Sequence, residues 1–124
     1  MAGARKEMVM TVTLYGIPNC DTVKKARKWL DAQGIAYTFH DYKKAGADPA
    51  KLQSWVDAKG WETVLNRVGT TFRKLPDADR EGLDAAKAVA LMAVHTSTIK
   101  RPVVEYPGGL LVGFKEPEWA AALT

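Results

Sequence analysis

The sequence predicts an α/β fold with a mixed four-stranded sheet, made from a β-α-β unit and a later β-β-α unit with a helical insertion between them. Two strand patterns enclose a helical pattern within residues 10–41. Helical patterns fill residues 46–95, and two strand patterns followed by a short helical pattern occupy residues 103–123. The 124 residues suit a single domain, residues 1–124, with one buried core.

The first unit begins with residues 10–15, whose apolar and polar side chains alternate as in a strand. Asn19 is the expected N-cap of a helix at residues 20–32, and Gly34 is the residue that ends this helix. Residues 35–41 are the predicted second strand. Because a strand-helix-strand unit makes a right-handed crossover, we expect these two strands to pair in parallel.

The helical insertion contains three predicted helices. An Asp-Pro pair at residues 48–49 predicts an N-cap followed by a proline in the first turn, and Gly60 ends this helix. Residues 61–65 predict a short second helix, whereas the polar residues 66–75 predict a loop. Asp84 is the predicted N-cap of the third helix.

The last unit follows a predicted loop at residues 96–101. Residues 103–106 and 110–113 are the two strand patterns, and the Pro-Gly-Gly sequence at residues 107–109 predicts a hairpin turn between them. Residues 116–123 predict a final short helix with a proline near its first turn.

Composition and charge exclude some functions. Hydrophobic residues make up 47% and charged residues 26%, as in soluble globular proteins, and no apolar run approaches the ~20 residues of a membrane span. Residues 1–7 lack the apolar region of a signal peptide, and we expect a loose tail there, native or added. The net charge of +4 would suit nucleic acid or a small anionic substrate. The cations at residues 24–28 share a helix with apolar residues, which predicts a solvated helix face.

Cys20 is the one cysteine of the chain, and it lies between a strand pattern and a helix pattern. Backbone N–H groups and the helix dipole stabilise a thiolate at such a position, and Lys24 follows one turn later. Val23 stands where a Cys-x-x-Cys motif carries its second thiol, so a redox cycle must take that thiol from another molecule. A lone cysteine forms no internal disulfide, which favours a reducing cytoplasm. The alternative is a buried structural cysteine.

A family resemblance is carried by four segments, at residues 15–22, 66–75, 99–104 and 112–115. Together they resemble the arsenate reductase (ArsC) family of the glutaredoxin-linked type, which also includes the Spx regulators and the YffB-type reductases. The resemblance implies a thioredoxin-like fold. The short spelling Gly-Ile-Pro-Asn-Cys-Asp-Thr at residues 16–22 looks nearest the YffB-type branch.

The resemblance also implies roles for particular residues. Cys20 would be the nucleophile, and Arg67 and Arg101 match two arginines that bind the substrate anion. Lys115 stands where arsenate reductases have a third arginine. Lysine keeps the positive charge but loses the planar bidentate fork, which weakens the case for arsenate as the substrate.

Glutathione is the external thiol co-substrate that the resemblance implies. Asn19 and Pro102 would bind it, with a cis peptide bond before Pro102 that brings the backbone beside the thiol. We expect no metal, because His40 and His95 are far apart and lack carboxylate or cysteine partners at metal-ligand spacing.

We therefore predict a cytoplasmic, glutathione-dependent monothiol reductase in which Cys20 forms a mixed disulfide or an oxyanion adduct. The expected partners are glutathione or a related thiol, glutaredoxin, and a small oxyanion or disulfide substrate, with neither membrane nor nucleic acid among them. One alternative is a true arsenate reductase that uses glutathione and glutaredoxin. Another is an Spx-like regulator that binds RNA polymerase and catalyses nothing, against which the valine at position 23 counts.

Overall fold

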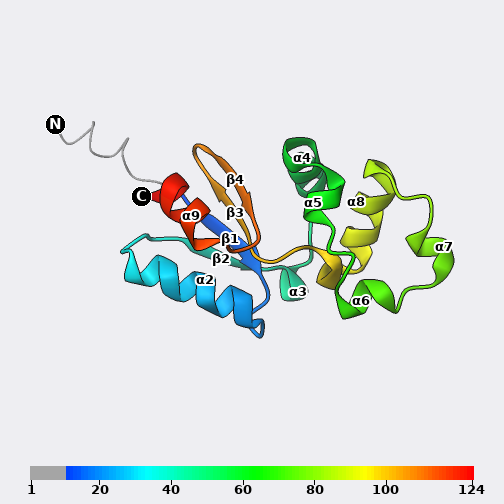
Figure 1. The fold of residues 1–124 in the computed structure, drawn as a ribbon, viewed down its shortest axis with the longest axis horizontal. Coiled ribbons are helices and arrows are strands. Elements are labelled where there is room, and N and C mark those ends of the chain that lie inside the picture. The colour runs from blue at the N-terminus through cyan, green and yellow to red at the C-terminus, as the bar shows by residue number, and fades with distance from the viewer. Residues whose placement is uncertain (1–10) are drawn as a thin grey trace.

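The centre of the fold is a four-stranded sheet with strand order β2-β1-β3-β4, seen in a computed structural model that describes residues 11–124 (Figure 1). Strand β1 (Thr13–Gly16) pairs in parallel with β2 (Thr38–Asp41) and antiparallel with β3 (Val103–Tyr106). The hairpin partner of β3 is β4 (Gly109–Val112). The predicted mixed sheet and its parallel pair are confirmed, although the first two strands are shorter than their sequence patterns.

One face of the sheet is covered by α2 (Asp21–Ala32) and α9 (Glu116–Leu123). Successive residues of a strand point to opposite faces, and the register aligns Leu14, Val104 and Leu111 across three strands on this face. These strand residues form a buried cluster with the apolar side of α2 and with Trp119 of α9. Burial of this apolar surface fixes α2 against the sheet.

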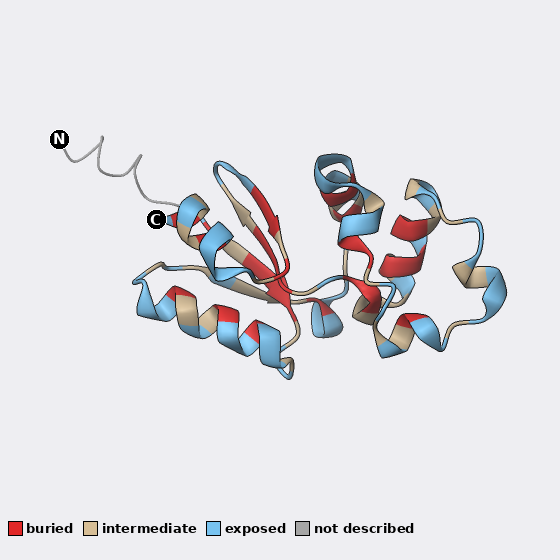
Figure 2. Ribbon diagram, in the orientation of Figure 1, coloured by how far each residue is buried: buried red, intermediate tan, exposed pale blue. Residues whose placement is uncertain are grey.

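The opposite face carries the helical segment between β2 and β3, which extends away from the sheet (Figure 1). Its helices are α3 (Tyr42–Ala45), α4 (Pro49–Lys59), α5 (Trp61–Val64), α6 (Thr70–Arg73), α7 (Asp77–Arg80) and α8 (Ala85–Val94), followed by the 3₁₀ turn η1 (Thr96–Thr98). Figure 2 shows the buried residues on the strands and on the inner sides of α4, α5 and α8.

The helix ends follow the predicted capping residues in two places. The Asp48 side chain accepts the Ala50 N–H at 3.0 Å, and the Asp84 side chain accepts the Lys87 N–H at 2.8 Å. The prediction of a loop at residues 66–75 was wrong, because Phe72 is buried in the core and anchors the single turn of α6. A polar sequence with one apolar anchor gives a weak helical pattern.

Glu105 of β3 connects the sheet to the helical segment. Its carboxylate accepts hydrogen bonds from the Tyr15 hydroxyl at 2.7 Å and from Trp55 Nε1 at 2.9 Å, and it pairs with Lys51 Nζ at 3.2 Å. Burial raises the pKa of Glu105, but these three donors outweigh burial and hold its pKa below the usual value. The carboxylate therefore binds α4 to β1 and β3 through charge-assisted contacts.

A β-bridge of one residue pair joins the two ends of the stretch that contains α6, α7, α8 and η1. Leu65 and Ile99 form an isolated antiparallel bridge, in which Asn66 N–H donates to Thr98 O at 2.7 Å and Lys100 N–H donates to Val64 O at 2.8 Å. In this register Asn66 lies opposite Thr98, and Lys100, shortly before β3, lies opposite Val64. No helix within residues 11–124 is long and apolar enough to cross a membrane.

Candidate active site

Cys20 is the N-cap residue of α2 and lies, half-buried, in the turn that follows β1. The prediction that Asn19 caps this helix was wrong: Asn19 is exposed and lies one residue further out, and Cys20 itself has the extended N-cap conformation. Gly16 allows α2 to pack close to the end of β1, since a Cβ at Gly16 would lie 2.9 Å from Val23 Cγ2. Val23 is fully buried against the sheet, so an apolar contact fills the position of a second thiol.

The sulfur of Cys20 lies in an environment that favours a thiolate. Burial raises the pKa of Cys20, but the Val23 N–H, the Arg101 guanidinium and the Thr22 N–H together outweigh burial and hold the pKa below its usual value. The Val23 and Thr22 N–H groups lie at the start of α2, where they favour the thiolate together with the helix dipole.

Arg101 is the cation in direct contact with the sulfur. Its Nε donates to Cys20 Sγ at 3.4 Å, and its Nη1 donates to Ser97 O at 3.1 Å, which fixes the plane of the guanidinium. The peptide bond between Arg101 and Pro102 is cis, as predicted. Pro102 is buried, and its carbonyl accepts the Gly113 N–H at 2.8 Å, which holds the end of β4 close to this bond.

Tyr42 was missed by sequence reasoning. Its side chain is 1% exposed, and its hydroxyl has no hydrogen-bond partner among the described residues 11–124. Burial raises the pKa of Tyr42, while the nearby Arg101 guanidinium acts in the opposite direction and the Cys20 sulfur adds to the rise. The hydroxyl thus stays protonated beside the reactive pair. A signal was present: Tyr42 directly follows β2, whose end lies beside that of the parallel strand β1.

A cavity of about 270 Å³ opens at Cys20 and is strongly cationic. Arg101 and Lys115 both line it, as does Lys100, which sequence analysis did not single out. Lys115 also pairs with Glu118 at 3.7 Å, so part of its charge is neutralised. The complete lining is Cys20, Thr22, Asn66, Lys100, Arg101, Gly113, Phe114 and Lys115.

Three predicted site residues do not line this cavity: Arg67, Asn19 and Pro102. Arg67 is exposed, and its guanidinium carbon lies 5.2 Å from the centre of the Trp61 ring, a cation-π arrangement. Arg67 lines a neighbouring cavity instead, which shares Asn66, Lys100 and Lys115 with the first. Asn19 lines neither cavity.

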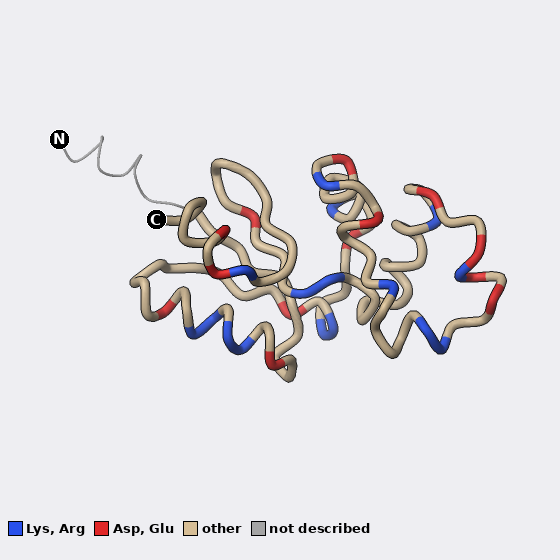
Figure 3. The backbone as a smooth tube through the Cα atoms, viewed as in Figure 1, with Lys and Arg blue, Asp and Glu red and all other residues tan. Residues whose placement is uncertain are grey.

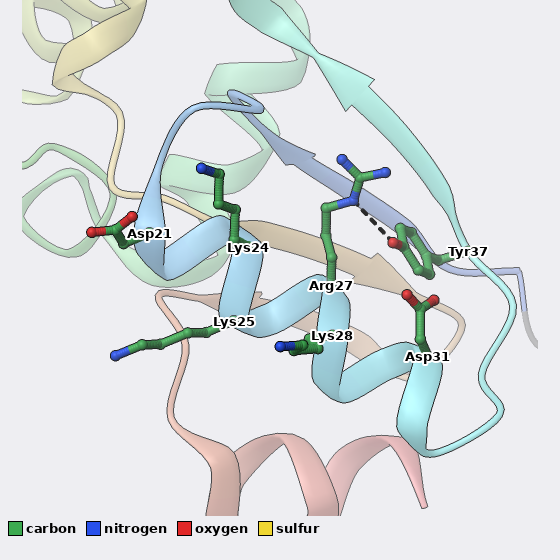
Figure 4. Close-up of a pocket in the computed structure, with 7 residues that line it drawn as sticks. All are labelled: Asp21, Lys24, Lys25, Arg27, Lys28, Asp31 and Tyr37. Atoms are coloured by element: carbon green, nitrogen blue, oxygen red, sulfur yellow. Dashed lines mark hydrogen bonds between the residues drawn. The ribbon is translucent and has the colours of Figure 1, made fainter.

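The cations of α2 form a separate solvated surface. Lys24 and Arg27 point to the side of α2 that faces Tyr37, whereas Lys25 points away from it (Figure 4). Arg27 Nε donates to the Tyr37 hydroxyl at 3.0 Å, and its guanidinium lies 4.1 Å from the centre of the Phe39 ring. Figure 3 shows a second group of cations in the segment that leads into β3, nearer the middle of the molecule.

The chemistry that this site supports is nucleophilic attack by sulfur. A thiolate beside a guanidinium, in a cavity lined by further cations, can attack a disulfide sulfur or the centre of an oxyanion. Lysine and arginine side chains at the cavity wall would stabilise the negative charge of the substrate and of the leaving group. Because Cys20 is the one cysteine of the chain, the resulting adduct must be released by a thiol from outside.

Comparisons with known proteins agree on one family. The ArsC family model matches residues 15–122. The solved structure of a protein named YffB is 57% identical, with a TM-score of 0.90, and the match covers 92% of this chain and 100% of that one. An arsenate reductase (ArsC) related protein from Brucella melitensis is 55% identical, with a TM-score of 0.72 and coverage of 90% and 92%. The global transcriptional regulator Spx of Streptococcus pyogenes is 29% identical over 91% of this chain and 85% of its own. These similarities confirm the predicted thioredoxin-like fold.

Proposed function

This chain belongs to the ArsC family, and from that premise we propose that it is a thiol-dependent reductase with Cys20 as its nucleophile. The observation that carries the proposal is the 3.4 Å contact between Arg101 Nε and Cys20 Sγ inside a cationic cavity. A contact of this kind lowers the pKa of the thiol and raises the fraction of reactive thiolate near neutral pH.

The proposed cycle has two exchange steps with balanced atoms and electrons. The Cys20 thiolate attacks one sulfur of a disulfide, the S–S bond breaks, and the other sulfur leaves as a thiolate that takes up a proton. Glutathione, as its thiolate, then attacks the outer sulfur of the mixed disulfide, and Cys20 leaves as the regenerated thiolate. The two electrons that reduce the substrate come from the outside thiols, and a glutaredoxin would be the natural acceptor of the glutathione adduct.

A second candidate activity is reduction of arsenate. Arg101, Lys100 and Lys115 surround the Cys20 cavity with positive charge, as an oxyanion requires. The 55% identical relative is described as arsenate reductase related, which supports testing this substrate. Lys115 binds as a point charge and not as a bidentate fork, so we place arsenate second.

A third candidate belongs to a different class, a regulator that binds RNA polymerase, and the relative named Spx motivates it. Position 23 is a valine, so a thiol switch between positions 20 and 23 has no place in this chain. Capture of RNA polymerase by the immobilised protein, without turnover of any disulfide, would favour this candidate. We propose a reducing compartment such as the cytoplasm for the chemistry of an unpaired thiol.

The test combines intact-mass analysis of the glutathione adduct with a turnover assay on a disulfide substrate. Treatment with oxidised glutathione should add one glutathione to the protein, and Cys20→Ser should add none. Turnover of a disulfide with reduced glutathione should require Cys20 and should fall about tenfold or more in Arg101→Gln, since one charge-assisted contact is lost. Arg73→Gln, an exposed cation of α6 outside the Cys20 cavity, is the matched control. Wild-type protein that forms no adduct and turns over neither a disulfide nor arsenate would contradict the proposal.

A further inference from the structure

We propose that the Tyr42 hydroxyl is a second hydrogen-bond donor for the Cys20 thiolate, which it reaches while it accepts a hydrogen bond from Arg101. The inference rests on the proposed function in one respect, because it takes Cys20 as the reacting group. It adds a residue that lies outside the four family segments and outside the lining of the Cys20 cavity. Tyr42 is the first residue of α3 and directly follows β2.

The Tyr42 hydroxyl is a buried polar group that the folded chain leaves unpaired. The side chain is 1% exposed, and no group of residues 11–124 forms a hydrogen bond with the hydroxyl. Within that range it is the one buried side-chain nitrogen or oxygen without a partner. An unpaired buried hydroxyl lowers the stability of the fold, so its retention in a packed core points to a use in the chemistry nearby.

The fold brings this hydroxyl to Arg101. The short helix α3 packs against both β1 and η1, and Arg101 Nη1 donates to the carbonyl of Ser97 within η1. The charge of the guanidinium acts on the Tyr42 hydroxyl, although the two groups do not yet meet in the geometry of a hydrogen bond. Because they are neighbours, a side-chain adjustment completes this bond without a change of fold.

The Cys20 sulfur lies at the same end of the sheet. The parallel strands β1 and β2 finish side by side at Gly16 and Asp41, so the turn of Cys20 and the first turn of α3 share one edge. Burial raises the pKa of Tyr42, and the Cys20 sulfur and the Asp41 carboxylate add to the rise, so the hydroxyl keeps a proton to donate. Arginine has donors and no acceptor, whereas a thiolate accepts. The hydroxyl can therefore accept from Arg101 and donate to sulfur.

The other charged groups around this pair have different contacts. Lys100 and Lys115 line the cavity at Cys20, where they meet the substrate. The Asp41 carboxylate accepts the backbone N–H groups of the two residues after Tyr42, at 3.0 and 3.3 Å, and so caps α3. The acceptor left for the Tyr42 hydroxyl is the sulfur, which becomes a strong acceptor when it loses its proton.

The proposed donor acts in both steps of the thiol exchange. It raises the fraction of Cys20 that is thiolate and ready to attack a disulfide. In the release step, the outside thiolate bonds to the outer sulfur, the bond to Cys20 breaks, and its electron pair returns to the Cys20 sulfur. Arg101 and Tyr42 then stabilise the negative charge on the departing sulfur, and a thiolate of lower pKa leaves faster.

The experiment uses Tyr42→Phe, which removes the hydroxyl and keeps the ring. The rate of iodoacetamide alkylation of Cys20 is followed against pH by intact mass. The midpoint should move to higher pH by about 1, the effect of one hydrogen bond to a charged group. Well below both midpoints the variant should react about threefold more slowly than wild type. Well above both it should react about threefold faster, since a thiolate of higher pKa is the better nucleophile.

Tyr37→Phe is the matched control. It removes a hydroxyl that accepts Arg27 Nε at 3.0 Å, outside the Cys20 cavity, and should keep the wild-type midpoint. Urea unfolding at pH 5, where Cys20 is a neutral thiol, should show no loss of stability in Tyr42→Phe, because the hydroxyl it removes is unpaired. An unmoved midpoint in Tyr42→Phe, or a rate that falls by one factor at every pH, would overturn the proposal.

Arg101→Gln tests the link between the two donors. Because Arg101 orients the hydroxyl in this proposal, Tyr42→Phe should move the midpoint less in an Arg101→Gln background than in wild type. An equal displacement in both backgrounds would overturn the shared network.

Alkylation needs no physiological substrate, which separates this inference from the proposed function. Wild-type protein that reduces neither a disulfide nor arsenate would contradict the reductase, whereas a displaced midpoint in Tyr42→Phe would still support the donor. An unmoved midpoint in a protein that does turn over disulfides would overturn the donor and leave the reductase standing.

Discussion

At the scale of the residue, the reactivity of Cys20 depends both on the start of α2 and on Arg101. Burial of the sulfur favours the neutral thiol, and the N–H groups of Val23 and Thr22 oppose it together with Arg101. The guanidinium carries a full charge at 3.4 Å, whereas each helix N–H carries a partial one. Burial lowers the pKa of Arg101, but the contacts with Cys20 and Tyr42 together outweigh burial and raise this pKa, so the cation stays charged throughout the working range.

Replacing Arg101 should therefore move the titration of Cys20. In the wild type, the rate of iodoacetamide alkylation should rise with a midpoint below the reference thiol pKa of about 8.5. In Arg101→Gln the midpoint should shift to higher pH, because the thiolate loses the cation that favours it. Thermal melts control for folding, and Lys28→Gln on the exposed side of α2 should keep the wild-type midpoint. An identical midpoint in Arg101→Gln would contradict this account.

Residue positions could be predicted from the sequence where the backbone alone decides them. The place of Cys20 at the start of α2 follows from the strand-turn-helix pattern. The direct contact of Arg101 with Cys20 agrees with the place in the site that the motif at residues 99–104 implied for Arg101. The direction of Arg67 could not be predicted, since it depends on the ring of Trp61. Lys100 and Tyr42 were missed because no spacing within a single element connects them to Cys20.

At the scale of the element, Glu105 makes β3 the meeting point of the sheet and α4. Tyr15 and Trp55 reach its carboxylate from β1 and α4, and their rings also contact each other, with centroids 4.8 Å apart. Glu105 is therefore a polar link between two elements 50 residues apart in the chain. A carboxylate held by several donors stabilises the folded state at neutral pH.

Glu105→Gln should lower the free energy of unfolding at pH 7 by about 1–2 kcal/mol, since the charge-assisted hydrogen bonds become neutral or are lost. The pKa of Glu105 is lower in the folded state than in the unfolded chain. The difference between wild type and variant is then fully present above the unfolded pKa of about 4.3 and disappears as pH falls through the lower folded pKa.

Urea unfolding at pH 7 and at pH 3 measures both values. Glu81→Gln, an exposed carboxylate after α7, is the control and should change the free energy of unfolding by less than about 0.5 kcal/mol. A destabilisation by Glu105→Gln that is equally large at pH 3 would show that the carboxylate charge contributes nothing.

Elements could be predicted where capping and periodicity agree. Asp48 and Asp84 cap α4 and α8 as predicted, and the final helix has the predicted bounds. The short α6 could not be predicted, because its stability comes from the burial of Phe72 by other elements and not from its own sequence.

At the scale of the whole molecule, the sheet lies between two hydrophobic clusters. The cluster with α2 contains Leu30, and the cluster with the helical segment contains Leu52, both fully buried. Neighbouring strand residues such as Val103 and Val104 belong to different clusters. The two clusters are therefore connected through the backbone of the same strands. Disruption of the packing in one cluster should also unfold the other.

Leu30→Ala and Leu52→Ala should each lower the free energy of unfolding by about 2–5 kcal/mol, the range for a buried leucine replaced by alanine. Each variant should unfold in a single transition that far-UV circular dichroism and tryptophan fluorescence report at the same urea concentration. Lys25→Ala on the exposed side of α2 is the control. Two separate transitions in Leu52→Ala would contradict the prediction of a single domain.

The order of elements predicted the architecture of the sheet, because a β-α-β unit and a hairpin can combine in few ways. The relation of the helical segment to the sheet could not be predicted in detail. It depends on long-range contacts such as those of Glu105 with Trp55 and of Leu65 with Ile99, for which single-sequence patterns give no signal.

The bridge between Leu65 and Ile99 has a consequence for evolutionary change in chain length. Residues 66–98 leave the bridge and return to it, so their number does not set the separation of Asn66 and Lys100. Extra residues at the exposed turn of Glu81 and Gly82 would lengthen a segment whose two ends the bridge already joins. The entropic cost of joining the ends of a loop rises only slowly with the length of the loop. Insertions and deletions at this turn should thus be tolerated while the cations beside the thiol keep their places.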